Sequence, residues 1–370
     1  MNLPFVKCDY PSSDGFIDEF KKILKGGPWT NNGSYLQLFE KELEKLLNTN
    51  VAVFNNGETA LFAMLSSLGI KDKYIIVPSY TFVGTVAAIV WSGNYPLFCD
   101  IKSTSYPLIN PVRVQELLEE DIACYKNVGA ILGVDLYGLP CDYTALNKLG
   151  FEYRVPVLID SAQSFGTFLK GKLVGSQCEA HTFSFHTTKA FHTLEGGAVT
   201  SPDEYLIEKV KRIRNFGMNV ISKGECSEVG LNGKMNEVQA LIGMHKIQDA
   251  RSTFARKKEL FSYYLGSLKH HNITTLTPPK YSNPMMNFMP VFINNRDQVF
   301  DSLNSQGITV NKYWDVPVHR MSAYEEFCPK GLDLPITDKV SKRALALPFY
   351  NKMSKKDIDY IVEKVYGTVV

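Results

Sequence analysis

The chain has 370 residues, a length that predicts two or three structural units. Hydrophobic residues make up 45% of it and charged residues 21%, a balance that is typical of a folded enzyme and excludes a fibrous or disordered protein. Lysine and arginine number 40, and aspartate and glutamate number 38, which leaves a formal charge of only +2. So small a charge argues against nucleic acid or an anionic membrane as a partner.

The cysteines and the apolar runs indicate in which cellular compartment the protein works. Seven cysteines are scattered without a CxxC pair, and an odd number argues against a complete disulfide framework. Residues 1–7 lack the apolar core of a signal peptide, and the apolar run at residues 82–91 is far shorter than a membrane span. We therefore expect reduced thiols in a cytoplasmic protein that has no contact with a membrane.

The first half of the chain alternates helical and strand patterns. Apolar residues recur with helical spacing over residues 36–47, which predicts a surface helix. Five short apolar runs, each typical of a buried strand, follow at residues 51–54, 74–77, 96–99, 130–134 and 155–159. Stretches of helical length separate most of them, so we predict a mainly parallel sheet with helices on both faces. Functional sites in such sheets gather at the carboxyl ends of the strands.

The second half is dominated by helical patterns. Residues 203–216 predict one helix, and residues 236–268 form a stretch with few helix breakers that is longer than a typical globular helix. We place a domain boundary inside this longer stretch. The boundary gives a large domain of residues 1–250 and a smaller C-terminal domain of residues 251–370.

The smaller domain has an alternation of its own. Two apolar strands are predicted at residues 288–293 and 308–314, and helical patterns separate and follow them as far as residues 358–362. The predicted fold class is therefore α/β, with a large domain built on a mainly parallel sheet and a smaller C-terminal α/β domain.

One lysine stands in unusual surroundings. Lys189 lies in a turn rich in Ser, Thr and His, between an apolar strand and two consecutive glycines, Gly196 and Gly197. Taken alone, a lysine in a turn is more often a solvated surface charge, so this motif needs support from other parts of the chain.

Three other segments carry candidate chemistry. Asp160 follows the apolar run at residues 157–159, either as a site carboxylate or as a helix-capping or turn residue. Residues 54–61 run from a strand through a glycine turn into a helix, where free backbone amides can hold a phosphate, although ordinary turns have the same composition. Residues 77–85 present aromatic rings beyond a strand, and core packing is the alternative explanation.

A single cofactor requires all four features. Pyridoxal phosphate (PLP) needs a lysine that bonds its aldehyde, an acid facing its pyridine nitrogen, a phosphate cup and a flat surface against its ring. At about 4 Å and an effective dielectric constant of about 20, a carboxylate and a pyridinium attract each other by roughly 4 kcal/mol before desolvation. Even part of that free energy keeps the ring nitrogen protonated near neutral pH. The combination therefore favours a PLP site.

The order of these motifs resembles one enzyme family over nearly the whole chain. It is similar to the DegT/DnrJ/StrS family of PLP-dependent nucleotide-sugar aminotransferases, which have the fold of the aspartate aminotransferase superfamily (PLP fold type I). The motifs that carry the resemblance lie at residues 27–33, 56–61, 78–82, 160–163, 184–189, 195–198, 214–217, 232–237 and 347–348.

The resemblance implies roles for four residues around the cofactor ring. Lys189 bonds the aldehyde and then moves the proton between the substrate carbon and the cofactor. Asp160 faces the pyridine nitrogen and Gln163 the phenolic oxygen, while Phe82 lies against the ring.

The resemblance also implies how the phosphate is bound. Backbone amides of Gly57 and Glu58 and the hydroxyl of Ser184 contact it. Asn232 reaches the phosphate of the neighbouring subunit, which implies a homodimer with shared sites. Two positions depart from the family pattern. Glu58 stands where a threonine is usual, so its carboxylate must turn away from a phosphate, and Lys234 replaces an arginine, which alters any planar contact there.

The substrates are implied by two further segments. Residues 186–197 are most similar to members that transfer the amino group of L-glutamate to C4 of dTDP-4-keto-6-deoxyglucose, giving dTDP-4-amino-4,6-dideoxyglucose for bacterial O-antigen synthesis. Residues 311–319 correspond to the region that contacts the nucleotide sugar in relatives, and Lys312 and Tyr313 are the expected contacts.

Three alternative functions remain open. The first is amination at C3 of a dTDP-3-keto-6-deoxyhexose. The second is a PLP-dependent sugar dehydratase, a lyase in which a histidine usually takes the place of the lysine, so Lys189 argues against it. The third is a non-catalytic regulator with the same fold, which the intact set of Asp160, Gln163, Ser184 and Lys189 disfavours. His181, His186 and His192 have no carboxylate or thiol arrangement typical of a metal site, so we expect no metal.

Overall fold

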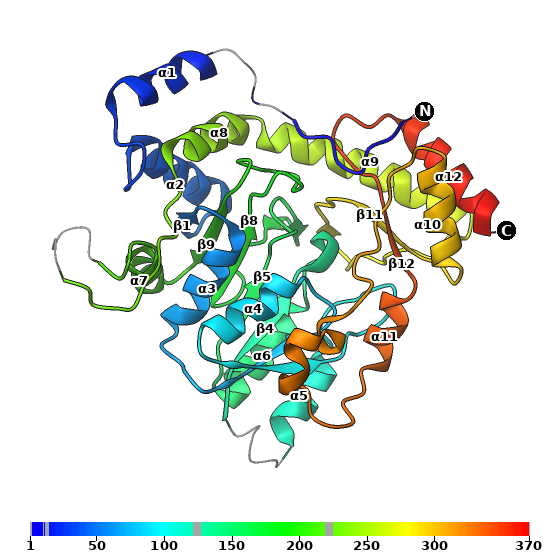
Figure 1. Cartoon of the computed structure of the whole chain (residues 1–370), viewed down its shortest axis with the longest axis horizontal. Coiled ribbons are helices and arrows are strands. Elements are labelled where there is room, and N and C mark those ends of the chain that lie inside the picture. The colour runs from blue at the N-terminus through cyan, green and yellow to red at the C-terminus, as the bar shows by residue number, and fades with distance from the viewer. Residues whose placement is uncertain (1, 10, 12–14, 121–126, 219–224, 370) are drawn as a thin grey trace.

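The computed structural model describes residues 2–9, 11, 15–120, 127–218 and 225–369 (Figure 1). Cys124 lies outside these residues, and the other six cysteines are free thiols. Within the described residues, no helix combines the length and the apolar character needed to cross a membrane.

A seven-stranded sheet forms the centre of the molecule (Figure 1). Its strands are β1 (Asn50–Phe54), β2 (Tyr74–Pro78), β3 (Tyr95–Cys99), β4 (Val128–Val134), β5 (Val157–Asp160), β8 (Ala180–Ser184) and β9 (Gly197–Ser201). Their order across the sheet is β1-β9-β8-β5-β4-β2-β3, and every pair from β8 to β3 is parallel. In this sheet β9 runs antiparallel to both its neighbours. The prediction of a mainly parallel sheet is therefore confirmed.

Helices cover both faces of this sheet. One face packs against α3 (Gly57–Ser67), α4 (Val83–Trp91) and α7 (Glu204–Arg214). The other face packs against α2 (Ser34–Leu47), α5 (Pro111–Glu119) and α6 (Tyr143–Tyr153). Successive side chains of a strand point to opposite faces, so in β1 Val51 and Val53 join the second core while Ala52 and Phe54 join the first.

The long helical stretch at residues 236–268 is two helices. They are α8 (Glu237–Gln248) and α9 (Ala250–His270), which meet at Asp249 beside the predicted domain boundary. Asn236 and Gln239 form a capping box that starts α8, because each side chain accepts the other residue's backbone N–H. The first helix, α1 (Phe16–Gly26), packs against α8. The division into two domains at this point stays a prediction.

The C-terminal elements surround a two-stranded antiparallel sheet. It consists of β11 (Met289–Phe292) and β12 (Ala344–Leu347), beside α9, α10 (Arg296–Ser305) and α12 (Lys355–Val369). The remaining short elements are β6 (Phe168–Leu169), β7 (Lys172–Leu173) and β10 (Ser282–Asn283), which form a small sheet, α11 (Pro335–Ser341), and the 3₁₀ turns Leu136–Gly138, Val318–Arg320 and Ser322–Phe327.

The predicted strand at residues 308–314 is wrong. The chain there makes two single bridges, from Ile308 to Leu3 and from Asn311 to Ala346. Pairing with β12 stops after Asn311 because the carbonyl of Tyr313 is bound elsewhere, by tyrosine hydroxyls at the carboxyl end of the large sheet. The second strand of the small sheet is instead β12, which lies some 30 residues later in the chain.

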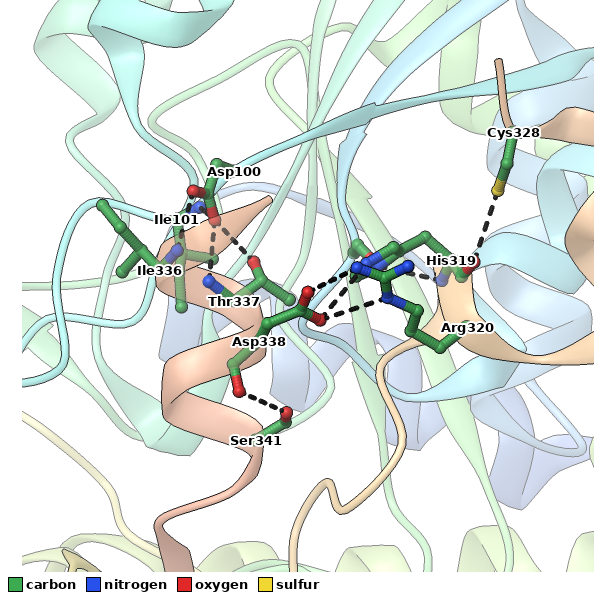
Figure 2. Close-up of polar contacts among 10 residues, drawn as sticks. Asp100, Ile101, His319, Arg320, Cys328, Ile336, Thr337, Asp338 and Ser341 are labelled. Carbon is green, nitrogen blue, oxygen red and sulfur yellow. Dashed lines mark hydrogen bonds and ion pairs between the residues drawn. The ribbon is translucent and has the colours of Figure 1, made fainter. Parts of the chain in front are cut away.

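Asp100 attaches α11 to the edge of the large sheet. It follows β3, and its carboxylate accepts the backbone N–H groups of Ile336 at 3.0 Å and Thr337 at 2.9 Å (Figure 2). These are free donors of the first helical turn, where a carboxylate also interacts favourably with the helix dipole.

A second set of contacts fixes the 3₁₀ turn Val318–Arg320. Asp338 accepts a bond from the guanidinium of Arg320 at 2.6 Å and lies 3.4 Å from Nε2 of His319 (Figure 2). The other ring nitrogen of His319, Nδ1, lies 2.6 Å from the hydroxyl of Ser79, which follows β2. The segment after Tyr313 is thus held against the carboxyl ends of β2 and β3.

Candidate active site

A cavity of about 540 Å³ opens at the carboxyl ends of the parallel strands. Eight of the ten site residues predicted from the sequence line it: Lys189, Gly57, Glu58, Phe82, Asp160, Gln163, Ser184 and Tyr313. The other two, Asn232 and Lys312, lie elsewhere. The structure therefore brings together motifs that are far apart in the chain.

Lys189 stands on the loop that joins β8 to β9. Backbone bonding folds this loop back on itself, since the N–H of Phe185 donates to the carbonyl of Gly196 at 2.7 Å. Next to the lysine, the N–H of Ala190 donates to the side-chain oxygen of Asn287 at 2.7 Å. The lysine is therefore presented to the cavity by a loop that is anchored on both sides.

The amine of Lys189 is suited to act as a nucleophile and base. Burial lowers its pKa from 10.5 to about 8, although the carboxylates of Asp160 and Glu195 act in the opposite direction. A sizeable fraction of the amine is then neutral at physiological pH, and the neutral form is the one that attacks an aldehyde or accepts a proton.

Asp160 is the last residue of β5 and is held in one orientation. The hydroxyl of Thr85 donates to one carboxylate oxygen at 2.7 Å, and the N–H of Ala162 donates to the other at 3.0 Å. Burial raises the pKa of Asp160, while these bonds and Lys189 lower it. Each carboxylate oxygen keeps a lone pair, so this buried acid fits a protonated ring nitrogen as its partner.

Gln163 is oriented by the backbone of the loop that follows β4. Its side-chain oxygen accepts the N–H of Tyr137 at 2.8 Å. The amide NH₂ is therefore the end left to donate into the cavity. A donor at this place fits the phenolic oxygen of PLP.

The start of α3 forms a cradle that fits a phosphate. The side chain of Asn56 caps the helix by accepting the N–H of Thr59 at 2.8 Å, and the earlier amides precede the helical hydrogen-bond ladder. A Cβ at Gly57 would lie 2.8 Å from the Cβ of Ser184, and one at Gly197 would lie 2.5 Å from the carbonyl oxygen of Asn56. Glycine at both positions lets the helix end approach the Ser184 hydroxyl, and such helix ends bind anions.

Two other residues line the cavity beside the cradle. The carboxylate of Glu58 lies toward Gly84 of α4, 3.2 Å from where a Cβ of that glycine would stand, and desolvation raises its pKa. Phe82 directly precedes α4 and is 58% exposed, so its ring is free to lie against a flat cofactor.

Asn232 and Lys312 do not line this cavity. Asn232 lies in a separate polar hollow, of about 480 Å³, together with Asn31 and Lys234. The ammonium of Lys312 is paired with the carboxylate of Asp297 at 2.6 Å. Within the single chain, neither residue joins the group around Lys189.

Several residues that orient the site were missed by the sequence reasoning. Thr85, Tyr137 and Asn287 bind Asp160, Gln163 and the lysine loop from behind. Thr85 lies inside a motif that was noted for its aromatic residues, but nothing local signals its partner. The tyrosine pair Tyr80 and Tyr137 was missed as well, and both hydroxyls lie 2.7 Å from the carbonyl oxygen of Tyr313.

The sequence matches the pattern of the DegT/DnrJ/EryC1/StrS aminotransferase family over residues 12–366. It is 28% identical over 374 residues to a dTDP-4-amino-4,6-dideoxy-D-glucose transaminase of Escherichia coli, covering 99% of this chain and 98% of that protein. It is 27% identical to a UDP-4-amino-4,6-dideoxy-N-acetyl-beta-L-altrosamine transaminase of Campylobacter jejuni, covering 95% of this chain and 94% of that protein.

The fold is similar to that of solved aminotransferases. Helicobacter pylori PseC, an aminotransferase involved in pseudoaminic acid biosynthesis, superposes with a TM-score of 0.89 at 23% identity, covering 100% of this chain and 99% of that one. A DegT DnrJ EryC1 StrS aminotransferase from Brucella abortus gives a TM-score of 0.88 at 24% identity, with 96% and 95% covered. The family resemblance and the predicted fold are both confirmed.

Proposed function

This chain belongs to the DegT/DnrJ/EryC1/StrS aminotransferase family and is a PLP-dependent sugar aminotransferase, and from this premise we propose its reaction. It transfers the amino group of L-glutamate to C4 of dTDP-4-keto-6-deoxyglucose, giving dTDP-4-amino-4,6-dideoxyglucose and 2-oxoglutarate. The match to the Escherichia coli transaminase over 99% of the chain supports this substrate. We place the reaction in the cytoplasm, as a step toward a bacterial O-antigen.

One arrangement carries the proposal: the amine of Lys189, the carboxylate of Asp160 and the amide of Gln163 line one cavity. Bound PLP supplies an aldehyde carbon that carries the amino group and a ring that accepts electrons from the reacting carbon. Asp160 holds a proton at the ring nitrogen, and Gln163 donates to the phenolic oxygen. The first amides of α3 and the hydroxyl of Ser184 hold the phosphate, and Phe82 covers a face of the ring.

Lys189 moves the proton in both half-reactions. Its amine lies in a buried site where its pKa is low, so its neutral form would be available as a base when PLP and glutamate are bound. The neutral Nζ takes the proton from the α carbon of glutamate. In the second half-reaction the same group delivers a proton to C4 of the sugar, in the reverse direction.

We also propose that the active unit is a homodimer. The polar hollow that holds Asn232, Asn31 and Lys234 supports this. Its side chains can donate hydrogen bonds to a phosphate, but neither Lys189 nor Asp160 lines it, so it is not a complete cofactor site by itself. Asn232 then binds the phosphate in the partner's site. Tyr313, on the cavity wall, contacts the nucleotide sugar. Lys312 can contact it only after its ion pair with Asp297 breaks.

A product assay tests the proposal. The purified protein is incubated with L-glutamate and dTDP-4-keto-6-deoxyglucose, and the product is identified by mass spectrometry and NMR. Formation of the 4-amino sugar with 2-oxoglutarate is the expected result. Three outcomes would contradict the proposed reaction. Reaction with only the 3-keto isomer would indicate amination at C3, and reaction with only a UDP-linked keto sugar would indicate another nucleotide. Loss of a hydroxyl without amine transfer would indicate a dehydratase. Lys189→Ala is expected to remove both turnover and the visible absorbance of the cofactor while the protein stays folded.

A further inference from the structure

The N-terminal segment of residues 3–9 lies outside the residues that match the family pattern, yet Phe5 and Val6 of this segment line the active-site cavity. At one end, Leu3 is buried and makes a parallel bridge with Ile308. Its N–H donates to the carbonyl of Gly307 at 2.8 Å, and its carbonyl accepts the N–H of Thr309 at 3.0 Å. This end is therefore fixed to the C-terminal part of the molecule.

The other end of the segment is fixed beside the lysine loop. The thiol of Cys8 lies 2.9 Å from the hydroxyl of Thr187, two residues before Lys189. The carbonyl of Asp9 accepts a bond from the ammonium of Lys246 on α8 at 3.0 Å. Because both ends are held, the residues between them are fixed where they cross the cavity.

Phe5 is the aromatic residue of this crossing segment. Its ring centre lies 5.7 Å from that of Phe288 and 5.7 Å from that of Tyr313, which it meets edge on. These three rings line the cavity together with Trp314. They form an aromatic wall on the C-terminal side, whereas Asp160 and the other predicted cofactor contacts come from the large sheet and its helices.

We propose that Phe5 is a specificity-determining residue for the sugar acceptor, an inference that rests on the proposed function. A sugar ring has apolar edges of C–H groups, and an aromatic ring that buries such an edge gains hydrophobic and dispersion energy. Glutamate is a short chain with two carboxylates, so charged and hydrogen-bonding partners, and not an aromatic wall, bind it. Phe5 therefore acts on the acceptor half-reaction and leaves the donor half-reaction nearly unchanged.

The test separates the two half-reactions of the holoenzyme. The donor half is followed by the absorbance of the cofactor after mixing with L-glutamate alone. The acceptor half is followed in the same way after the amino-loaded enzyme is mixed with dTDP-4-keto-6-deoxyglucose. For Phe5→Ala we expect the half-saturating concentration of the sugar nucleotide to rise about tenfold, which corresponds to about 1.4 kcal/mol, while that of glutamate changes less than about twofold.

Companion variants separate this role from general stability. Phe5→Tyr keeps the aromatic ring and is expected to restore the affinity for the sugar, whereas Phe5→Leu is expected to give an intermediate loss. Phe16→Ala removes an aromatic residue that packs on Phe20 and His245 outside the cavity, and it should leave both half-reactions unchanged. Thermal melting of each variant shows whether it folds. An equal loss in both half-reactions of a folded variant, or an unchanged affinity for the sugar in Phe5→Ala, overturns the proposal.

Failure of the proposed function gives a different result. If the wild-type enzyme does not respond to glutamate, the donor is wrong, and the effect of Phe5 is then read from calorimetric titration of the holoenzyme with dTDP-4-keto-6-deoxyglucose. Weaker binding to Phe5→Ala than to the wild type supports the role of Phe5 even then. Equal binding, or no binding to the wild type, overturns it.

Discussion

At the scale of single residues, the pKa of Lys189 determines how fast the apoenzyme takes up its cofactor. Burial lowers this pKa from 10.5 to about 8, and the protonated amine below that pH cannot attack an aldehyde. We predict that the rate of PLP uptake rises with pH and levels off above about 8. Stopped-flow recording of the visible absorbance of the cofactor over this pH range measures it.

The carboxylate of Asp160 provides the control for this prediction. Its charge raises the pKa of Lys189, so Asp160→Asn should move the midpoint of the uptake rate to lower pH. A wild-type midpoint near 10.5, the ordinary value for lysine, would show that the site does not desolvate the amine.

Eight of the residues that line the cavity could be predicted from the sequence, whereas the residues that orient them from behind could not. Asp160 and Lys189 stand in motifs that a single cofactor explains together. Thr85 acts through one hydrogen bond to Asp160, which is 75 positions away, and Tyr137 acts through its backbone N–H. Neither kind of contact leaves a mark on the local sequence, because any residue except proline offers the N–H and many threonines are surface residues.

At the scale of elements, the close approach of α3 to β8 depends on Gly57. A Cβ there would lie 2.8 Å from the Cβ and 3.1 Å from the Cα of Ser184, so the helix end must move away from the strand. We predict that Gly57→Ala keeps the fold but weakens PLP binding by about tenfold or more, since the amides at a helix end bind an anion only at short range. Absorbance titration of the apoenzyme with PLP measures the dissociation constant.

Gly266 offers the matched control for this substitution. It lies within α9, and a Cβ there would meet nothing within 4 Å. Gly266→Ala should leave PLP binding unchanged and stabilise the protein by up to about 1 kcal/mol, because alanine favours a helix interior. If both variants bind PLP like the wild type, the cradle does not depend on the close approach of α3.

His319 is predicted to hold the C-terminal turn against β2. Its Nδ1 lies 2.6 Å from the hydroxyl of buried Ser79, and its Nε2 faces Asp338 (Figure 2). His319→Leu leaves the buried Ser79 hydroxyl without its imidazole partner and removes the ring that faces Asp338, which should lower the free energy of unfolding by about 1–3 kcal/mol in urea denaturation. Arg320→Ala removes a half-exposed partner of the same aspartate and should cost less than about 1 kcal/mol. Equal losses would contradict the buried role of the histidine.

Contacts with distant parts of the chain account for two features: the wrong strand prediction at residues 308–314 and the motif at residues 27–33. Residues 308–314 have a strand-like pattern, but Tyr313 is bound by tyrosines from the other half of the molecule. The motif at residues 27–33 resembles the family pattern, but the sequence alone offers no structural reason for it. In the structure the buried carboxylate of Glu237 accepts the N–H of Tyr35 at the start of α2, and a Cβ at Gly33 would clash with that carboxyl group.

At the scale of the whole molecule, the parallel sheet was easier to predict than the C-terminal part. The five strands β1 to β5 are mostly apolar runs because both faces of the sheet are buried, so their pattern is local. The C-terminal part is joined by contacts between distant segments, such as Leu3 with Ile308 and Asp100 with α11. The helices α8 and α9 follow one another along one side of the molecule and connect the two parts (Figure 1).

A buried lysine on α9 makes the stability of the whole molecule depend on pH. The ammonium of Lys257 donates to the carbonyl of Met286 at 2.7 Å and lies 4.7 Å from the centre of the Phe349 ring. Burial lowers its pKa from 10.5 to about 7. Between these two values the unfolded chain binds a proton that the folded protein lacks, so stability rises with pH by up to about 1.4 kcal/mol per unit.

Lys257→Met should remove this contribution. We predict that the free energy of unfolding of the holoenzyme rises less steeply with pH, between about 7 and 10.5, in this variant than in the wild type. Urea denaturation at several pH values gives the two slopes. Lys258→Met, which changes the exposed neighbour on the same helix, should keep the wild-type slope because that side chain is solvated in both states. A slope in Lys257→Met equal to that of the wild type would mean that the folded protein keeps Lys257 protonated throughout this range, with the carbonyl of Met286 and the face of Phe349 compensating for its burial.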